Sequence, residues 1–231
     1  MNGSPAEAPN EPASRKRQQA AEAFDGEQVG GAERTRQLLL SAAQKEFAEA
    51  GIAGARIDRI ARLAGVNKQA IYYHFGNKED LFRILLEYGY EQTLRKNEEI
   101  DVRALPPVEA ISAIVGQLFD RISSNREHME LILDENRHHG RHLKGKFHHV
   151  VDPLISKIAE VVSRGEVAGE FRSGLKPDEL YLDMISMIML YFTNIYTLSW
   201  LLGKDLSAED ALQQRKRHVI DFILMAIQSS R

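Results

Sequence analysis

Hydrophobic residues recur along most of this chain at spacings of three and four, the pattern of helices with one buried face. The pattern starts after Glu33 and continues until Gly51, a residue type that commonly ends helices. Further along, it predicts short helices over about 57–64 and 68–75 and a longer helix over about 78–100. No alternating stretch longer than four residues indicates a strand, and no internal repeat is present. We therefore expect an all-α fold.

The segments before and after this region also have sequence patterns that predict their structure. Residues 1–33 contain several Pro and Gly, a basic triplet and almost no apolar residues, which predicts a disordered N-terminal arm. Beyond Pro107 the helical spacing continues to the end of the chain. It predicts helices over about 108–124, 126–137, 142–165, 178–202 and 207–229.

The two short helices and the residues between them have the pattern of a helix-turn-helix. Ala61 and Ala64 lie on the apolar face of the first short helix, and their small size lets a second helix cross closely. Gly65 suits a left-handed turn, Val66 suits the inside of that turn, and Asn67 suits the cap of the next helix. This motif predicts a DNA-binding domain, because its second helix can enter the major groove.

The second short helix has side chains suited to reading DNA. Lys68 can donate to guanine and Gln69 can bond adenine in bidentate fashion. The hydroxyl groups of Tyr72 and Tyr73 can donate to phosphate, and His74 follows on the same helix. For Tyr73, packing inside the domain stays open as an alternative.

The same residues resemble the signature of the TetR family over about residues 34–82. The resemblance rests on Ile60-Ala61, Ala64-Gly65-Val66, Ile71-Tyr72-Tyr73-His74-Phe75 and Asn77-Lys78-Glu79-Asp80-Leu81. It implies that Tyr72 and Lys78 hold phosphates, whereas the other side chains of this helix lie at or near the groove. Arg56 stands where the family often has a Thr that caps a helix and touches phosphate, and Gln69 stands where a small residue is common. The candidate DNA-binding residues are Arg56, Asn67, Lys68, Gln69, Tyr72, Tyr73, His74 and Lys78.

The resemblance implies a three-helix helix-turn-helix domain followed by a larger helical domain for ligand binding and dimerisation. We expect an arm over 1–33, a DNA-binding domain over 34–82 and the ligand-binding and dimerisation domain over 83–231. The function it implies is a sequence-specific transcriptional regulator, a repressor that a small-molecule effector releases from its operator. Activation instead of repression stays open.

Charge is distributed in agreement with this division. The whole chain has a formal charge of -3, but residues 34–83 hold nine Lys or Arg against five acids, a local balance of +4. The rest of the chain therefore has 21 basic and 28 acidic residues. Only the first segment is suited to approach phosphates. A binder without sequence preference would share this charge, and equal affinity for random DNA would identify it.

Composition argues against enzyme chemistry. The chain has no Cys, no Gly-rich phosphate loop and no nucleophilic serine elbow, so we expect neither catalysis nor a cofactor. The absence of Cys suits a reducing compartment, and the first residues have no apolar segment typical of a secretory signal. We expect a cytoplasmic protein.

The segment from Leu180 to Leu202 has 17 apolar residues in 23, which is long enough for a membrane span. Its Ser, Thr and Asn residues and the lack of flanking charge asymmetry favour a helix buried between the core and a partner subunit. The last helix has a similar apolar stripe. We therefore expect no membrane contact but a homodimer, which would bind a roughly palindromic double-stranded DNA operator.

A histidine cluster lies between His128 and His149, and His138 and His142 have the spacing of a helical metal pair. Four Lys or Arg crowd the same stretch, so we expect no metal there, although a metal-dependent hydrolase stays open as an alternative. Nothing in the sequence identifies the effector. Candidate ligand-binding residues are Phe119, Met129, Phe147, Met184, Met187, Tyr191 and Tyr196.

Overall fold

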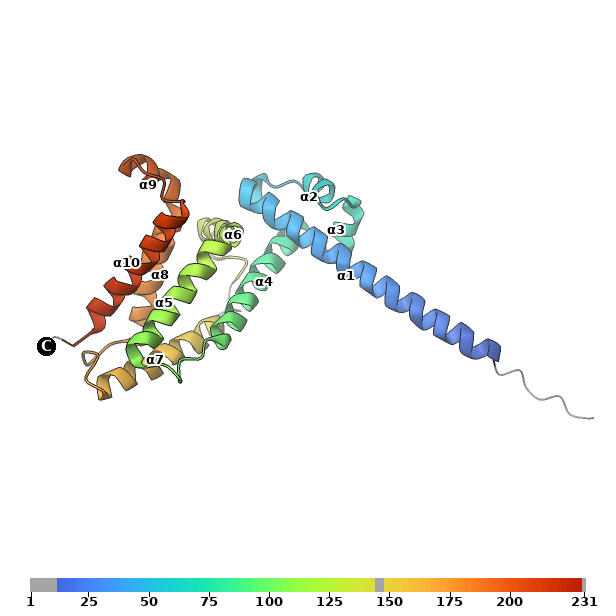
Figure 1. Ribbon diagram of the computed structural model, residues 1–231. Helices are drawn as coiled ribbons and strands as arrows, with labels where there is room; N and C mark the ends of the chain where they lie inside the picture. Colours follow the sequence, from blue (N-terminus) through green and yellow to red (C-terminus); the bar gives the residue numbers. More distant parts are fainter. Residues whose placement is uncertain (1–11, 144–147, 230–231) are drawn as a thin grey trace, which may run out of the picture.

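The computed structural model describes residues 12–143 and 148–229, and the side chains of this range except those of 12–30 and 148. The described chain is helical with no strand, which confirms the expected all-α class (Figure 1). The helices are α1 Pro12–Gly54, α2 Ile57–Ala64, α3 Lys68–Phe75, α4 Lys78–Glu99, α5 Pro107–Ser124, α6 Arg126–Arg137, the 3₁₀-helix η1 His148–Val150, α7 Asp152–Val167, α8 Pro177–Thr193, α9 Ile195–Leu202 and α10 Glu209–Ile227.

The structure differs from the sequence prediction at three places. Helix α1 begins at Pro12, so residues 12–33 are helical where a disordered arm was expected. This stretch is rich in Ala, Gln, Glu and Arg, which favour a helix even without a core to bury.

The other two differences are breaks in predicted helices. The helix expected over 142–165 begins ten residues later, because α7 starts only at Asp152. Before it, His139 and Gly140 adopt left-handed backbone conformations directly after α6. The expected helix over 178–202 is divided at Asn194, whose side chain donates to the carbonyl of Leu190 at 3.1 Å and so ends α8.

Two separate cores hold the fold together. The first lies among α1, α2, α3 and the start of α4, and it also includes the fully buried Leu131 of α6. The second lies among α5, α7, α8 and α10. Helix α4 leaves the first group and runs to the second, where its far part packs against α6, η1 and α7 (Figure 1).

The far end of α4 is fastened by a lysine. The Nζ atom of Lys157 in α7 donates to the carbonyls of Asn97, Glu98 and Ile100, each at 2.7 Å. A cation on the free carbonyls of a helix C-terminus both satisfies them and complements the helix dipole. The end of α4 is therefore fixed to the second core.

In the described part of the chain no single helix is long and apolar enough to cross a membrane. Helices α8 and α9 together have sufficient length and apolar content, but they are bent by 72° at the break between them.

Candidate nucleic-acid interface

The turn between α2 and α3 has the geometry that its sequence predicts. Gly65 is left-handed, with φ 69° and ψ 28°, and the N–H of Val66 donates to the carbonyl of Ala61 at 3.0 Å. The side-chain oxygen of Asn67 accepts from the N–H of Gln69 at 3.0 Å, as an N-cap does. This use of its side chain holds the start of α3 in place.

Helix α3 is anchored on one side and open on the other. Ile71 and Phe75 are buried in the first core. Tyr72 is 52% exposed and Tyr73 is 85% exposed, so neither tyrosine packs inside the domain. The ring of His74, which is half-buried, meets the ring of Tyr73 edge-on at 5.1 Å. The outward face of α3 is thus aromatic and polar.

Two further candidates lie at the start of α3 on the same exposed side. Gln69 is exposed and its side-chain amide forms no hydrogen bond with another described residue, so this amide is available. The Nζ atom of Lys68 lies 3.4 Å from a carboxylate oxygen of Asp58 in α2. Because both groups of this pair are well exposed, a phosphate or base can compete for the ammonium at little cost.

A buried glutamate positions α2, and the sequence reading missed it. Glu46 of α1 is 1% exposed, and its Oε1 accepts from the backbone N–H of Arg56 at 3.0 Å. Its Oε2 lies 2.9 Å from Nε of Arg59 in α2. The carboxylate therefore caps α2 where Arg56 provides no side-chain cap, and the Arg56 side chain stays exposed at the helix N-terminus.

Lys78 has a partner within the protein. Its Nζ donates to the carbonyls of Ala55 at 3.2 Å and Ala53 at 3.5 Å, at the end of α1. An ammonium has three N–H donors, so one remains for a phosphate. Lys78 thereby joins the start of α4 to the segment that leads into α2.

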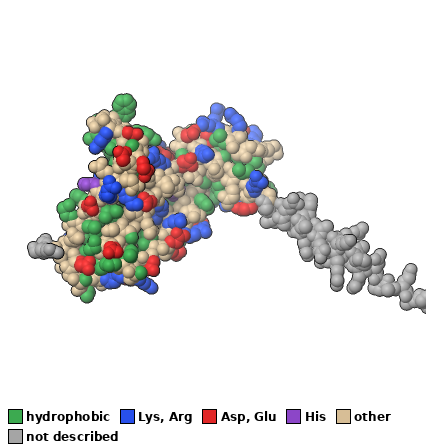
Figure 2. All heavy atoms as spheres, viewed as in Figure 1, with side chains coloured by type: hydrophobic (Ala, Val, Ile, Leu, Met, Phe, Trp, Pro, Cys, Tyr) green, Lys and Arg blue, Asp and Glu red, His purple; other side chains and the backbone are tan. Residues whose placement is uncertain are grey.

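Basic side chains gather on the same part of the surface. Figure 2 shows Lys and Arg side chains clustered over the α2 end of the molecule, whereas Asp and Glu are more frequent over the rest of the face. The local charge of +4 over residues 34–83 agrees with this picture. The surface around α2 and α3 can attract a polyanion.

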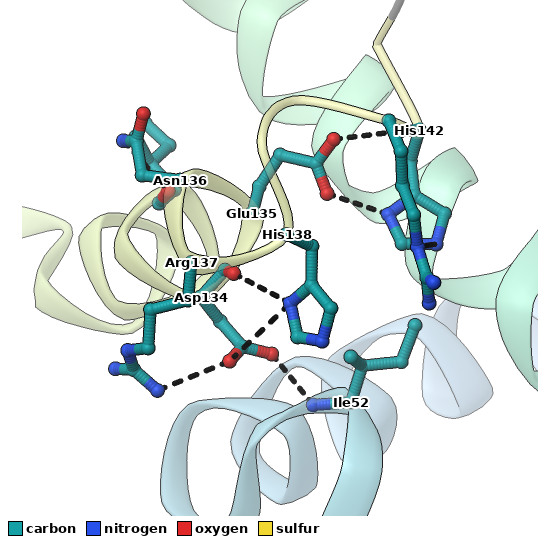
Figure 3. A network of polar contacts seen from close by, with 9 residues as sticks. Ile52, Asp134, Glu135, Asn136, Arg137, His138 and His142 are labelled. Atoms are coloured by element: carbon teal, nitrogen blue, oxygen red, sulfur yellow. Dashed lines mark hydrogen bonds and ion pairs between the residues drawn. The ribbon is translucent and has the colours of Figure 1, made fainter.

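The helix-turn-helix part is joined to the rest of the protein by α6, which packs along the end of α1 (Figure 3). The Oδ2 atom of Asp134 accepts from the buried backbone N–H of Ile52 at 2.7 Å. The neighbouring Gly51 has φ 63° and ψ 171°, a conformation that favours glycine, and a Cβ there would lie 3.2 Å from the same carboxylate. Arg137 pairs with Asp134 at 3.1 Å on the solvent side.

Two histidines of the cluster, His138 and His142, lie beside this contact between α6 and α1. The backbone N–H and the Nδ1 atom of His142 contact the two carboxylate oxygens of Glu135, at 2.7 and 2.5 Å, and the His142 ring meets Phe82 of α4 edge-on at 5.3 Å. The Nδ1 atom of His138 lies 2.8 Å from the carbonyl of Asp134. Among the described side chains, those of residues 31–143 and 149–229, no group of three or more His, Cys, Asp or Glu is placed to hold a metal.

The candidate ligand-binding residues do not surround one cavity. Phe119 and Met184 are 2% and 0% exposed and pack in the second core. Met129 lines a cavity of about 260 Å³ between α4, α5, α6 and α8. Phe147 lies outside the described residues.

The remaining three candidates lie away from that cavity. Met187 lines a surface hollow between α8 and α10, and Tyr196 is 71% exposed on α9. Tyr191 is buried, and its hydroxyl donates to the carbonyl of Leu206 at 2.6 Å. Arg121 and His128 also line the 260 Å³ cavity, but no sequence motif indicates that they share a ligand-binding site, so neither was among the candidates.

Two family models match the chain. Residues 39–85 match "Bacterial regulatory proteins, tetR family", and residues 107–223 match "Tetracyclin repressor-like, C-terminal domain". The chain is 29% identical over 198 residues to the HTH-type transcriptional repressor NicS of Pseudomonas putida, covering 85% of this chain and 93% of that protein.

Solved structures share the fold. A putative transcriptional regulator, SCO4942 of Streptomyces coelicolor, matches with a TM-score of 0.64 and 23% identity, over 84% of this chain and 98% of that one. The transcriptional regulator FadR of Bacillus subtilis, in complex with stearoyl-CoA, matches with a TM-score of 0.62 and 20% identity, over 82% of this chain and 97% of that one. With the helix-turn-helix geometry and both family models in agreement, the chain belongs to the TetR family and is a helix-turn-helix transcriptional regulator.

Proposed function

We propose that this protein is a homodimeric repressor that binds a roughly palindromic DNA operator and leaves it when a small-molecule effector binds. The observation that carries the proposal is the outward face of α3, where Lys68, Gln69, Tyr72 and Tyr73 are exposed while the opposite face is anchored in the core. A recognition helix needs such an anchored back and a free front to read base edges.

We assign two kinds of DNA contact. Lys68, Gln69 and Tyr73 contact base edges in the major groove, with His74 beside them at the groove. Arg56, Tyr72 and Lys78 contact phosphates, and Asn67 supports them by capping α3. The domain division that follows is a DNA-binding domain over 34–82 and a ligand-binding and dimerisation domain over 83–231, with residues 1–33 as an N-terminal extension.

Dimerisation is supported by apolar side chains that α8 and α10 leave exposed. Leu182 and Leu190 of α8 are 52% and 63% exposed, and Phe222 and Met225 of α10 are 49% and 72% exposed. These helices pack against each other, so the exposed side chains belong to adjacent surfaces. A partner copy would cover them and place two α3 helices on successive major grooves, about 34 Å apart.

The dimer is testable with matched substitutions of exposed apolar residues. Phe222→Glu should shift the protein to a monomer in sedimentation velocity at micromolar concentration. Val167→Glu is the control, because Val167 is 88% exposed on α7, a helix that contributes none of these four side chains. A wild-type protein that is soluble and monomeric at this concentration would contradict the dimer.

Effector release is supported by the placement of α4 and α6. Helix α4 starts beside α3 and ends fixed to α7, and α6 contacts both α1 and α4. A shift of α4 or α6 in the ligand-binding domain would therefore move α3. A coupling of about 1–3 kcal/mol would weaken operator binding about 5–150-fold, and DNA would weaken effector binding by the same factor.

The deciding experiment is selection of bound sequences from a random DNA pool, followed by a screen of metabolites for release. We expect enriched sequences with two inverted half-sites and an affinity of ~0.01–10 nM at physiological salt. The affinity should fall steeply as salt rises. Equal affinity for random DNA would instead identify a binder without sequence preference.

A further inference from the structure

The cavity of about 260 Å³ between α4, α5, α6 and α8 lies where the two cores meet. Its apolar wall includes Met129, Ile132, Ile185 and Met189. Its volume is near the small end of the range of small-molecule sites, which is about 300–1,000 Å³. A compact molecule with an apolar body fits such a space.

One positive charge lies in this wall, on the guanidinium group of Arg121. The Nη1 atom of Arg121 in α5 donates to Oδ1 of the buried Asn97 at 2.6 Å. Among the described side chains, those of residues 31–143 and 149–229, no carboxylate forms an ion pair with Arg121. Burial lowers the pKa of Arg121, and the nearby hydroxyl of Tyr181 acts in the opposite direction. Arg121 is half-buried, and a partly desolvated cation gains strongly from an anionic partner, so this guanidinium is suited to receive an anion.

A histidine also lies near Arg121 in the wall of the cavity. The Nε2 atom of His128 in α6 is buried and has no hydrogen-bond partner within the described structure. Burial, and secondly the charge of Arg121, lowers the pKa of His128 to about 4, so its ring is neutral at physiological pH. A neutral imidazole has one N–H, and with that proton on Nε2 it can donate to an anion beside Arg121.

The surroundings hold this histidine in place. Its ring packs directly on Gly89 of α4, where a Cβ would lie 1.8 Å from the ring, and meets Tyr90 edge-on at 5.9 Å. Tyr90 and Tyr181 both line the cavity, and burial raises the pKa of each hydroxyl. Among the described residues that line this cavity, the polar groups are cationic or neutral, and none is anionic.

We propose that this cavity binds a small organic carboxylate, with its carboxylate on the Arg121 guanidinium and a hydrogen bond from His128, and with its apolar body against the methionine and isoleucine wall. The inference rests on the proposed function, since it names the chemical class of the effector. Because α4, α6 and α8 all contribute to the wall, a bound molecule also contacts the helices that join the two cores.

A larger hollow, of about 420 Å³, lies between α8 and α10. It contains both basic and acidic side chains, including Lys176 and Asp183, so it has no excess of one charge. It also lies on the surface proposed for dimerisation, which a partner copy would cover. The cavity at Arg121 is the better effector site on both grounds.

The test uses matched pairs of small carboxylates and their primary amides, namely benzoate, phenylacetate and hexanoate with benzamide, phenylacetamide and hexanamide. Thermal unfolding and calorimetry on the full-length protein measure their binding. We expect carboxylates, and not amides, to raise the melting temperature of the wild type. Arg121→Gln should weaken carboxylate binding about tenfold or more.

Two further variants complete the design. Arg95→Gln is the matched control, since Arg95 is exposed on α4 and should leave carboxylate binding unchanged. Ile185→Phe fills the cavity while keeping Arg121, so it should abolish binding even if Arg121→Gln folds poorly. Binding of amides as tight as that of carboxylates, or carboxylate binding that survives both Arg121→Gln and Ile185→Phe, would overturn the proposal.

Operator binding is measured on the same preparation, so that the two proposals fail separately. A wild type that binds its selected operator but responds to none of the carboxylates overturns the carboxylate site alone. A wild type without sequence preference for DNA overturns the proposed function, whether or not carboxylates bind.

Discussion

Replacing Asp134 tests the contact that joins α6 to α1. The variant Asp134→Ala removes the acceptor of the Ile52 N–H, a buried hydrogen bond of 2.7 Å to a charged group. It also removes the pair with Arg137, whose side chain is 66% exposed. We expect the free energy of unfolding to fall by about 2–3 kcal/mol.

The magnitude follows from the two contacts separately. A hydrogen bond to a charged group contributes about 1.5–3 kcal/mol, and the loss is at the upper part of that range when a buried donor is left unsatisfied. An exposed ion pair contributes only about 0–1 kcal/mol. Arg137→Ala, which removes the ion pair and keeps the buried bond, should therefore cost less than about 1 kcal/mol.

Urea denaturation at one fixed protein concentration measures both variants, because the stability of a dimer depends on concentration. Asp134→Asn is a third variant, in which an amide oxygen can still accept from Ile52 without the charge, and it should fall between the other two. If Asp134→Ala and Arg137→Ala lowered the urea concentration at the unfolding midpoint equally, the buried hydrogen bond would contribute nothing to stability, which would refute this prediction.

The remaining predictions concern DNA reading and the wall of the cavity. Lys68→Ala or Gln69→Ala should change which operator sequence is preferred, whereas Lys78→Ala should weaken all sequences alike in gel-shift titrations; the opposite outcome would reverse the assignment of base and phosphate contacts. Gly89→Ala should destabilise the protein by about 1–3 kcal/mol in thermal unfolding, because its Cβ would lie 1.8 Å from the His128 ring. His128→Ala should recover most of that loss in the double variant, and simply additive losses would contradict the clash. Burial lowers the pKa of His128 to about 4, from its ordinary value of about 6.5. Between pH 6.5 and pH 4 the His128 ring is therefore protonated in the unfolded chain but not in the folded protein, so the free energy of unfolding should decrease as the pH falls through this range. The ring signal of His128 in NMR should titrate near pH 4, and a midpoint above pH 6 would refute the burial argument.

The helix-turn-helix could be predicted from the sequence because its signals are local. Gly65 for the left-handed turn, Asn67 and Asn77 for the caps, and Ala61 and Ala64 for the close crossing each act within a few residues. The structure confirms these features, and both cap hydrogen bonds are made between residues two or three apart in the sequence.

Contacts between distant segments could not be predicted in the same way. The break at Asn194 depends on a side-chain bond to the preceding turn, and an apolar pattern runs straight through it. Glu46 is one acid among several in α1, and only the fold shows that it is buried on α2. Arg121 and His128 belong to different helices whose spacing in the sequence does not indicate that they share a cavity. Their placement depends on how α4, α5, α6 and α8 pack.

Leu131 of α6 is fully buried in the core of the N-terminal helices, and this has a consequence for protein engineering. A fragment that ends after α4 would lack this side chain, as well as the Asp134 carboxylate that binds Ile52, and would expose the apolar surface they cover. Losing a buried leucine alone costs about 2–5 kcal/mol. A chimaera that combines a different DNA-binding domain with this C-terminal domain therefore has to exchange the residues of α6 that face α1 together with α1–α3. Otherwise the two domains will not pack against each other.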